Sequence, residues 1–232
     1  LDELLALTPG VQPELLLVGQ EIVLPAAPVV ETAVPVVTGQ EVMVMVEGLG
    51  TYNAVPAGMW VLGEVHNAGQ QPVELVQVSV TLHRPGGSEM ASQTLWVSPV
   101  TLVAGGRAPF GVLFPEEYAA GAQVETTVVG GRPVYELGNR YLDLAVVEAE
   151  VTIGRNPIAV AGRLENNGEL PAGQISIITT FYDDRGDVAG YHELLVEDVI
   201  TPGESAPFEF IALPPGGRVD GYDFAIQAFV AN

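Results

Sequence analysis

Three aspartates around one glycine are the side chains of this sequence best suited to chemistry. Asp183, Asp184 and Asp187 surround Gly186, and carboxylate oxygens are the ligands that Ca²⁺ prefers in proteins. Asp and Gly are also the residues that turns use most, and no ligand-rich loop follows. We therefore interpret the segment as an acidic hairpin turn between two strands, with a calcium site as the alternative. We expect no other metal site.

The same turn contains Arg185-Gly186-Asp187, the tripeptide that integrins recognise. A short motif needs its structural context before it indicates a function. Three residues in a turn-prone stretch do not supply that context, and we expect no adhesion through them.

Histidines and aromatic residues are the other candidates for a site. His66, His83 and His192 could bind a metal or act as bases, but they lie in unrelated stretches, and we expect them to face solvent. Exposed aromatic rings stack on sugars and anchor protein contacts. We expect core or junction packing instead, with Tyr135 and Tyr141 wedged between two domains, and keep a ligand surface as the alternative for Trp60, Trp96, Tyr118, Tyr135 and Tyr191.

Composition excludes several classes of function. The chain has 29 acidic residues against 8 basic ones, a net charge of −21, and no Lys or Cys. Nucleic acids and anionic membrane surfaces need cationic side chains, so neither is an expected partner. Schiff-base and thiol chemistry are also excluded. No nucleophile elbow, zinc-protease motif or phosphate loop occurs, and we predict no enzymatic activity and no cofactor.

No apolar stretch is long enough to cross a bilayer, so we expect no membrane insertion. The chain begins at Leu1 rather than Met. We expect it to be a processed or excised piece of a longer protein.

An internal repeat indicates the architecture. Residues 62–73 resemble residues 161–172, with Gly63 and Gly162 at matching places, and the Ala-Pro-Phe of 108–110 returns at 206–208. The spacing is close to the roughly 100 residues of an immunoglobulin-like sandwich and too long for a solenoid repeat.

Each copy alternates apolar and polar residues as half-buried strands do. Val76, Val78, Val80 and Leu82 form the first apolar stripe, and Ile175, Ile177, Thr179 and Phe181 form the second, which has Ile178 and Tyr182 on its other face. Phe110 and Phe208 begin further alternating strands. Gly63 and Gly162 predict a bulge or a close backbone approach. The segments 67–69 and 166–168 contain Asn and Gly, which tolerate positive φ, and we expect strand connections there.

The repeat resembles the FxLYD-type immunoglobulin-like domains of bacterial envelope and exported proteins. The resemblance covers residues 41–232. It rests on G-x-V-x-N-x-G before a Pro, on Phe181-Tyr182-Asp183, and on the segment 202–208. The first copy departs from the pattern at 82–87, where it lacks the aromatic and acidic turn. The resemblance implies non-catalytic sandwich modules.

Residues 4–25 resemble the second half of a LysM module, a family that binds N-acetylglucosamine glycans such as peptidoglycan. The resemblance implies that Thr8, Pro9, Gly10 and Val11 form one wall of the sugar groove, although Thr8 stands where the family commonly has Asn. The first strand, first helix and opposite wall are absent, so this half alone should not hold glycan.

These observations predict an all-β protein of two tandem immunoglobulin-like antiparallel β-sandwiches after a short helical or extended N-terminal segment. We expect a partial LysM-like segment at 1–25, a Pro-rich linker at 26–40, and sandwiches at 41–134 and 135–232. The expected function is a non-catalytic, extracytoplasmic bacterial envelope protein: a glycan-tethered spacer or a module for an unknown protein partner. The alternative is a sandwich that itself binds protein or calcium, with residues 1–25 only a remnant.

Overall fold

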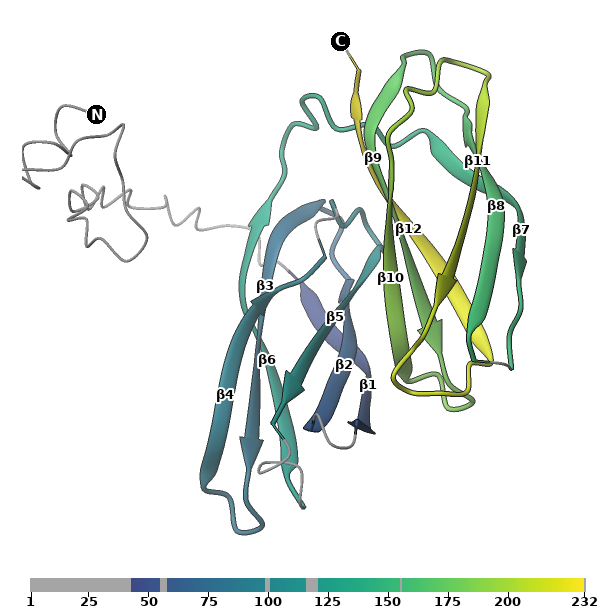
Figure 1. The fold of residues 1–232 in the computed structure, drawn as a ribbon. Coiled ribbons are helices and arrows are strands. Elements are labelled where there is room, and N and C mark those ends of the chain that lie inside the picture. The colour runs from purple at the N-terminus through teal and green to yellow at the C-terminus, as the bar shows by residue number, and fades with distance from the viewer. Residues whose placement is uncertain (1–42, 55–57, 99–100, 116–120, 155, 232) are drawn as a thin grey trace, which may run out of the picture. The chain divides into compact units, whose positions relative to one another are not determined.

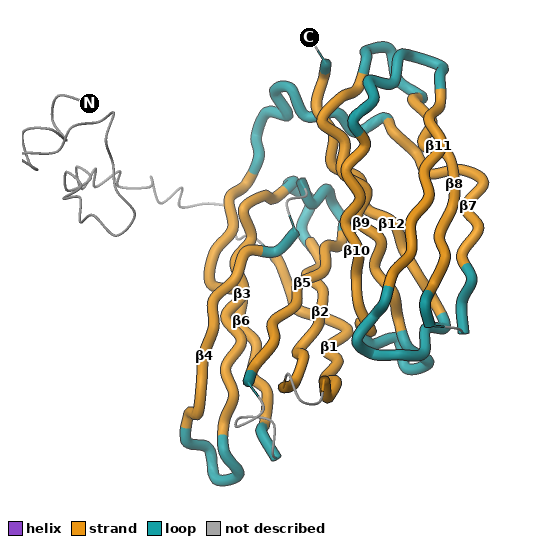
Figure 2. The backbone as a smooth tube through the Cα atoms, in the orientation of Figure 1, coloured by secondary structure: helices purple, strands orange, loops and turns teal. Residues whose placement is uncertain are grey.

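The computed structural model describes residues 43–54, 58–98, 101–115, 121–154 and 156–231. Its twelve elements in these ranges are all β-strands, and every strand pair is antiparallel (Figures 1 and 2). The predicted fold of tandem antiparallel sandwiches is therefore confirmed. The helical or extended segment, the linker and the predicted glycan wall at 8–11 lie outside the described residues.

The strands form four three-stranded sheets. In the first copy, one sheet has the order β1-β2-β5 and the other β4-β3-β6; in the second, the orders are β11-β8-β7 and β10-β9-β12. The first six strands are β1 (Val44–Ala54), β2 (Gly58–Asn67), β3 (Val73–His83), β4 (Glu89–Trp96), β5 (Arg107–Phe114) and β6 (Gln123–Pro133). The second six are β7 (Leu144–Val151), β8 (Ile158–Asn166), β9 (Ala172–Tyr182), β10 (Val188–Val196), β11 (Ser205–Ala212) and β12 (Gly221–Val230).

The two copies share their topology strand by strand, β1 corresponding to β7 and so on to β6 and β12. They also share an irregularity. Leu75 in β3 and Gln174 in β9 both have positive φ, 52° and 49°. Such a conformation is uncommon for residues other than Gly. Its recurrence at matching places is a shared feature of the fold.

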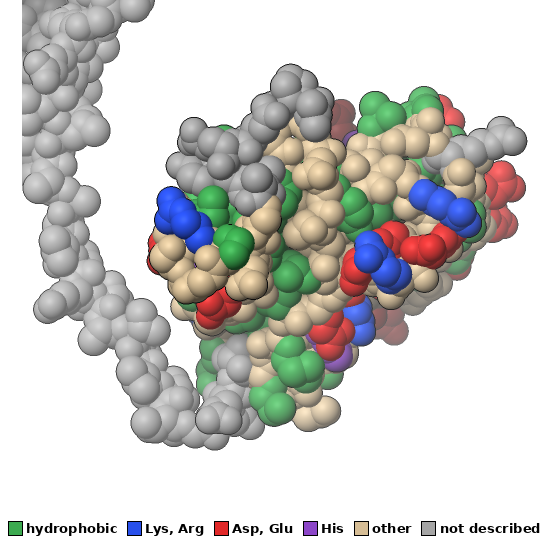
Figure 3. Space-filling model, turned by 90° about the horizontal axis from the view of Figure 1, so that it is seen from below, with side chains coloured by type: hydrophobic (Ala, Val, Ile, Leu, Met, Phe, Trp, Pro, Cys, Tyr) green, Lys and Arg blue, Asp and Glu red, His purple; other side chains and the backbone are tan. Residues whose placement is uncertain are grey.

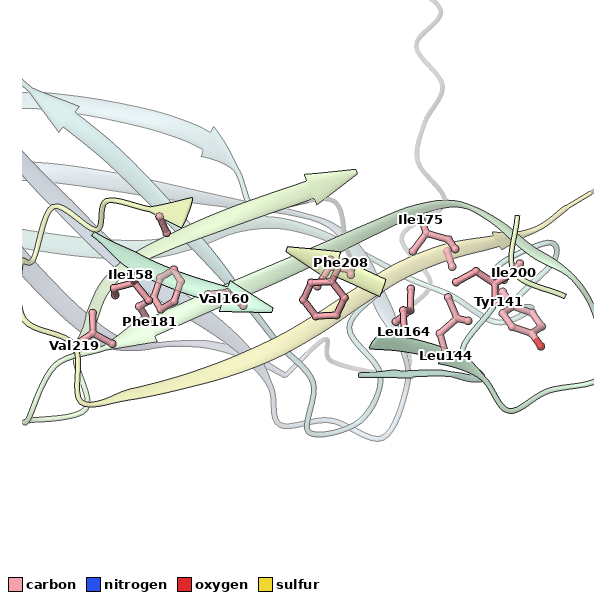
Figure 4. Packing of buried hydrophobic residues seen from close by; sticks show 14 of the residues in the cluster. Tyr141, Leu144, Ile158, Val160, Leu164, Ile175, Phe181, Ile200, Phe208 and Val219 are labelled. Atoms are coloured by element: carbon pink, nitrogen blue, oxygen red, sulfur yellow. The ribbon is translucent and has the colours of Figure 1, made fainter. Parts of the chain in front are cut away.

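The core consists of two clusters, one in each sandwich. Val78 and Ile177 lie on equivalent strands and are both fully buried, each in its own cluster. The alternation predicted for β3 and β9 is thus confirmed. Figure 4 shows the second cluster: Ile158 and Val219 lie at one end, Phe208 in the middle, and Tyr141 and Leu144 at the other end.

Two glycines allow an aromatic ring to lie against a strand. A Cβ on Gly63 would lie 2.7 Å from the ring of Phe110, and a Cβ on Gly162 would lie 2.8 Å from the ring of Phe208. Both distances are shorter than carbon atoms tolerate. The close approach expected from sequence is therefore present in both copies.

The strand connections predicted after Asn67 and Asn166 are present, but without positive φ at these residues. Neither they nor Gly69 and Gly168 have positive φ. Both asparagines are instead fully buried. Each side-chain amide donates to carbonyl oxygens of two loops, and each Oδ1 accepts a hydrogen bond from the Gly two residues later. A buried amide needs such partners, and these bonds tie the strand connections together.

Tyr135 and Tyr141 do not form the predicted wedge. Tyr135 is exposed. Tyr141 belongs to the second core cluster, and its hydroxyl donates to Asn166 Oδ1 at 2.6 Å. The ring is thus held inside one sandwich by the same asparagine that ties its loops.

Residues 41–232 form one compact unit by their contacts. The boundary expected between 134 and 135 therefore stays a prediction. Within the described ranges, no helix is long and apolar enough to span a membrane.

Candidate functional site

The outer face of sheet β1-β2-β5 is covered although its side chains point away from their own core. Along β2, Val61 and Val65 enter the first core cluster. The alternate residues Leu62 and Glu64 lie on the other face, yet they are only 1% and 2% exposed. Another part of the chain must therefore cover this face.

The covering surface is the outer face of sheet β10-β9-β12. Strand β10 contacts β1, β2 and β5, and β5 also contacts β9. Ile178 of β9 is fully buried but belongs to neither core cluster. A Cβ on Gly111 of β5 would lie 3.2 Å from the ring of Tyr191 in β10. We call this contact between the two sheets the junction, with Leu62, Glu64, Ile178 and Tyr182 at its centre.

A buried carboxylate holds the junction together. Arg107 donates to Oε1 of Glu64, and the hydroxyl of Tyr182 donates to Oε2 at 2.8 Å. A buried charge is strongly unfavourable unless it is paired and hydrogen-bonded. Both oxygens of Glu64 have partners, one from its own sandwich and one from the other. The carboxylate therefore links the two sandwiches.

The network continues to the edge of the first sandwich. Arg107 also contacts Glu47 Oε2 at 3.0 Å, and Glu47 Oε1 lies 3.2 Å from His66 Nδ1. Burial alone would lower the pKa of Arg107, but the hydrogen bond and charge of Glu64 outweigh it and raise that pKa. Burial, followed by the hydrogen bond to Glu64, raises the pKa of the Tyr182 phenol. Arg107 therefore stays charged and Tyr182 stays neutral at ordinary pH.

A second contact joins β1 to the turn between β9 and β10. The Tyr52 hydroxyl donates to Asp183 Oδ2 at 3.4 Å. Burial, then the charges of Asp183 and Asp187, raise the pKa of Tyr52 to about 12. A Cβ on Gly48 would lie 3.3 Å from the carbonyl oxygen of Gly186. The acidic turn is thus part of the junction.

A third contact joins the segment between β4 and β5 to β12 of the second sandwich. The backbone N–H of Thr101 donates to Gln227 Oε1 at 2.9 Å. Glu74 of β3 accepts from both Arg132 and Arg140, and Arg140 lies in the segment between β6 and β7. Burial would raise the pKa of Glu74, but these two hydrogen bonds outweigh it and hold the pKa below its usual value.

The three aspartates of the predicted turn do not gather as a cation site. Asp183 Oδ1 accepts from the backbone N–H groups of Arg185 and Asp187, at 2.9 and 3.0 Å, and Oδ2 contacts the Arg185 side chain at 3.2 Å. Within the described ranges, no group of three or more His, Cys, Asp or Glu side chains could hold a metal ion. The geometry is that of an acidic turn closed by its own backbone, while the calcium alternative stays a prediction.

The three histidines lie in three separate places. His66 contacts Glu47, and His83 Nε2 lies 2.9 Å from Glu125. His192 stacks on Phe210 with ring centroids 4.4 Å apart, and burial lowers its pKa. On the face of the molecule that Figure 3 shows, basic side chains (blue) likewise lie against acidic ones (red). These contacts neutralise charge locally rather than gather it at one centre.

Two of the predicted aromatic residues share a hollow. Trp96 and Tyr191 line one pocket of about 360 Å³ beside the junction, and Trp96 is 60% exposed. Trp60 is half-buried on β2, and Tyr118 lies outside the described residues. The predicted core or junction role does not describe Trp96, whose exposure fits the alternative of a ligand surface.

Glu64 and Arg107 are not among the site residues predicted from the sequence. Ile178 and Tyr182 are noted there only because they make the second face of their strand more apolar than the equivalent face in the first copy. The signal was in the comparison of the copies. Arg163 occupies the place of Glu64 in the second copy, and Ser79 occupies the place of Ile178 in the first. A change of charge or size between repeats marks faces with different surroundings.

Known proteins add little. No family of proteins and no curated protein matches this sequence. The structure is similar to the crystal structure of red sea bream transglutaminase at 12% identity with a TM-score of 0.25, over 78% of this chain and 30% of that protein. The chain thus spans less than a third of that protein's length, and a likeness of this size carries no argument about function.

Proposed function

We propose that residues 41–232 act as a stiff, non-catalytic double sandwich in the envelope of a bacterium, outside the cytoplasm. The observation that carries the proposal is the junction. Leu62 and Ile178 are buried there, and Glu64 is satisfied by one residue from each sandwich. Burying one such aliphatic side chain contributes about 1.5–3 kcal/mol, so docking opposes the independent motion expected for two domains on a short linker.

The glycan tether is the second part of the proposal. It rests on the resemblance of residues 4–25 to half of a LysM module, with Thr8, Pro9, Gly10 and Val11 as one wall. The sandwiches would then hold a partner away from the wall. Their net charge supports this role, because like charge keeps neighbouring copies apart.

Backbone ¹⁵N relaxation of the full chain tests the stiff unit. We expect one rotational correlation time for the residues of both sandwiches. The variant Leu62→Arg should separate them into two faster-tumbling bodies, because it places a charge without a partner in a contact where Leu62 is 1% exposed. Ala161→Arg is the matched control at the equivalent, exposed place of the second copy. Independent tumbling of the unmodified sandwiches would refute the proposal.

Pull-down on purified peptidoglycan tests the tether. This chain should stay in the supernatant, and a version extended by the first half of a LysM module should be retained. Failure of the extended version to bind would refute the tether and leave the stiff unit untouched.

A further inference from the structure

A groove runs beside the junction between strand β4 and strand β10. Its lining residues are Leu75, Trp96, Val97, Ser98, Tyr191 and Glu193, and its volume is about 360 Å³. We call it the Trp96 groove. Leu75 is brought to its surface by the positive φ that breaks the register of β3, and both Leu75 and Trp96 are more than half exposed. Large apolar side chains gathered in a hollow mark a contact surface.

One carboxylate lies in this apolar lining. Glu193 accepts a hydrogen bond from Ser176 Oγ at 2.5 Å, and no ion pair of the described ranges includes it. Burial, then the charge of Glu193, raises the pKa of Tyr191. The charge of Glu193 therefore acts on the aromatic wall of the groove. A cation bound in the groove would be attracted both by this carboxylate and by the aromatic rings.

The groove continues into a second hollow of about 330 Å³, which shares Leu75 and Glu193 with it. Arg140 lies in this second hollow, but its guanidinium is held by Glu74. Leu195, 70% exposed, adds an apolar surface there. Two connected hollows suit an extended segment whose alternate side chains enter them.

We propose that the Trp96 groove binds an extended segment of a partner protein through a Lys or Arg side chain, whose cation lies on the face of Trp96 and pairs with Glu193. A cation over an indole ring gains about 0.5–2 kcal/mol, and a carboxylate adds a charge-assisted hydrogen bond. The protein carries a net charge of −21, which attracts a basic partner over a distance. The groove rests on the proposed function, because its walls come from both docked sandwiches.

The test uses the full chain and two matched five-residue peptides, acetyl-Ser-Val-Arg-Val-Ser-amide and the same peptide with Gln for Arg. Binding is followed by the NMR signal of the Trp96 indole N–H. We expect the Arg peptide to shift that signal, and the Gln peptide to bind at least about five times more weakly. Glu193→Gln should weaken the Arg peptide about tenfold and remove the preference for it, and 0.5 M NaCl should weaken it too. Glu209→Gln, which removes an equal charge from the uncovered face of the second sandwich on β11, should change nothing.

Several results would overturn the groove. These are equal binding of the two peptides, no shift with either, or an unchanged affinity in Glu193→Gln. A shift with choline chloride equal to that with the Arg peptide would indicate a site for small cations, and a shift with tetra-N-acetylchitotetraose alone would indicate a sugar site. The rotational correlation times of the two sandwiches, measured in the same samples, distinguish the failure of the groove from the failure of the stiff unit. If the sandwiches tumble together but the Arg peptide does not bind, only the groove is refuted. If the sandwiches tumble independently, the stiff unit is refuted as well.

Discussion

Replacing Glu64 by Gln tests whether the buried carboxylate holds the sandwiches together. Glu64 is 2% exposed, with Arg107 on one oxygen and the Tyr182 hydroxyl on the other. Gln has nearly the same shape, so the change removes the charge without opening a cavity. Among the described residues, Arg107 then keeps only Glu47 as an anionic partner.

The expected cost is about 2–3 kcal/mol. A hydrogen bond to a charged group contributes about 1.5–3 kcal/mol, and breaking a fully buried ion pair costs about 3–5 kcal/mol. The Arg107 side chain is 40% exposed, which keeps the estimate near the lower value. For a unit of this size, the loss lowers the melting temperature by about 4–12 °C.

Urea unfolding of four variants measures this cost. Arg163→Gln is the control, because Arg163 occupies the equivalent place on the uncovered face, and we expect its effect to stay within about 0.5 kcal/mol. Tyr182→Phe and the double variant with Glu64→Gln complete a cycle, with an expected coupling of about 1 kcal/mol or more. If Glu64→Gln costs no more than Arg163→Gln, or the coupling is zero, the carboxylate does not link the sandwiches.

Three further predictions concern single side chains. Thr179 has a buried Oγ1 without a hydrogen-bond partner in the described ranges, and its equivalent in the first copy is Val80; Thr179→Val should therefore stabilise the protein by about 1–2 kcal/mol in urea unfolding, and a loss of stability would show a hidden partner. The pKa of Glu74 is lowered in the folded protein, so the stabilisation by this carboxylate is present above its unfolded pKa and is lost as pH falls through its folded pKa. Glu74→Gln should therefore be less stable than the parent at pH 7, and the difference in stability should close below about pH 4. A difference in stability that does not depend on pH would refute this. Calcium at 1 mM should leave the melting temperature where chelator leaves it, since Asp183 Oδ1 already accepts two backbone N–H groups; a shift abolished by Asp183→Ala would restore the calcium site.

The sequence predicts the sandwiches well, because a strand that is buried on one face alternates apolar and polar residues with a period of two. Val78 and Ile177 are predicted to point inward, and both do. A close approach at Gly63 and Gly162 is predicted as well, because a glycine inside a strand is typical of a bulge or of a group that approaches the backbone closely. The identity of that group, the ring of Phe110 or Phe208, is shown by the structure alone. These features depend on neighbours within one copy, and the repeat shows each of them twice.

The junction is not predictable in the same way. Glu64 and Tyr182 lie 118 positions apart and belong to different copies, so no periodicity relates them. The strand connections after Asn67 and Asn166 are predicted correctly, but the positive φ that their residues tolerate is absent for another reason. Their composition suits positive φ, but a side-chain amide that binds carbonyl groups gives the same residue preference. Composition alone does not separate these two causes.

The way the copies dock explains why the two halves of the repeat differ where they do. The junction pairs the outer face of β1-β2-β5 with the outer face of β10-β9-β12, two sheets that are not equivalent in the repeat. Such a heterologous contact does not close on itself. The first copy keeps its β4-β3-β6 face free, which is equivalent to the β10-β9-β12 face buried in the second copy. The second copy keeps its β11-β8-β7 face free, which is equivalent to the β1-β2-β5 face buried in the first copy. If those unused faces carried the same residues, further copies could add without limit.

The unused faces carry different residues. Where Leu62 and Glu64 lie in the first copy, the second has the exposed pair Ala161 and Arg163. Where Ile178 and Tyr182 lie in the second copy, the first has Ser79 and His83. Each replacement removes buried area or changes the charge that the contact needs. The free faces therefore cannot form a second contact of the same kind with another molecule. We expect end-to-end self-association in sedimentation velocity when the second copy gains Ala161→Leu, Arg163→Glu and Ser205→Arg and the first gains Ser79→Ile and His83→Tyr. Ser205 holds the place of Arg107, so the new carboxylate keeps a cation beside it. A monomeric variant with these five changes would show that these residues do not determine the contact.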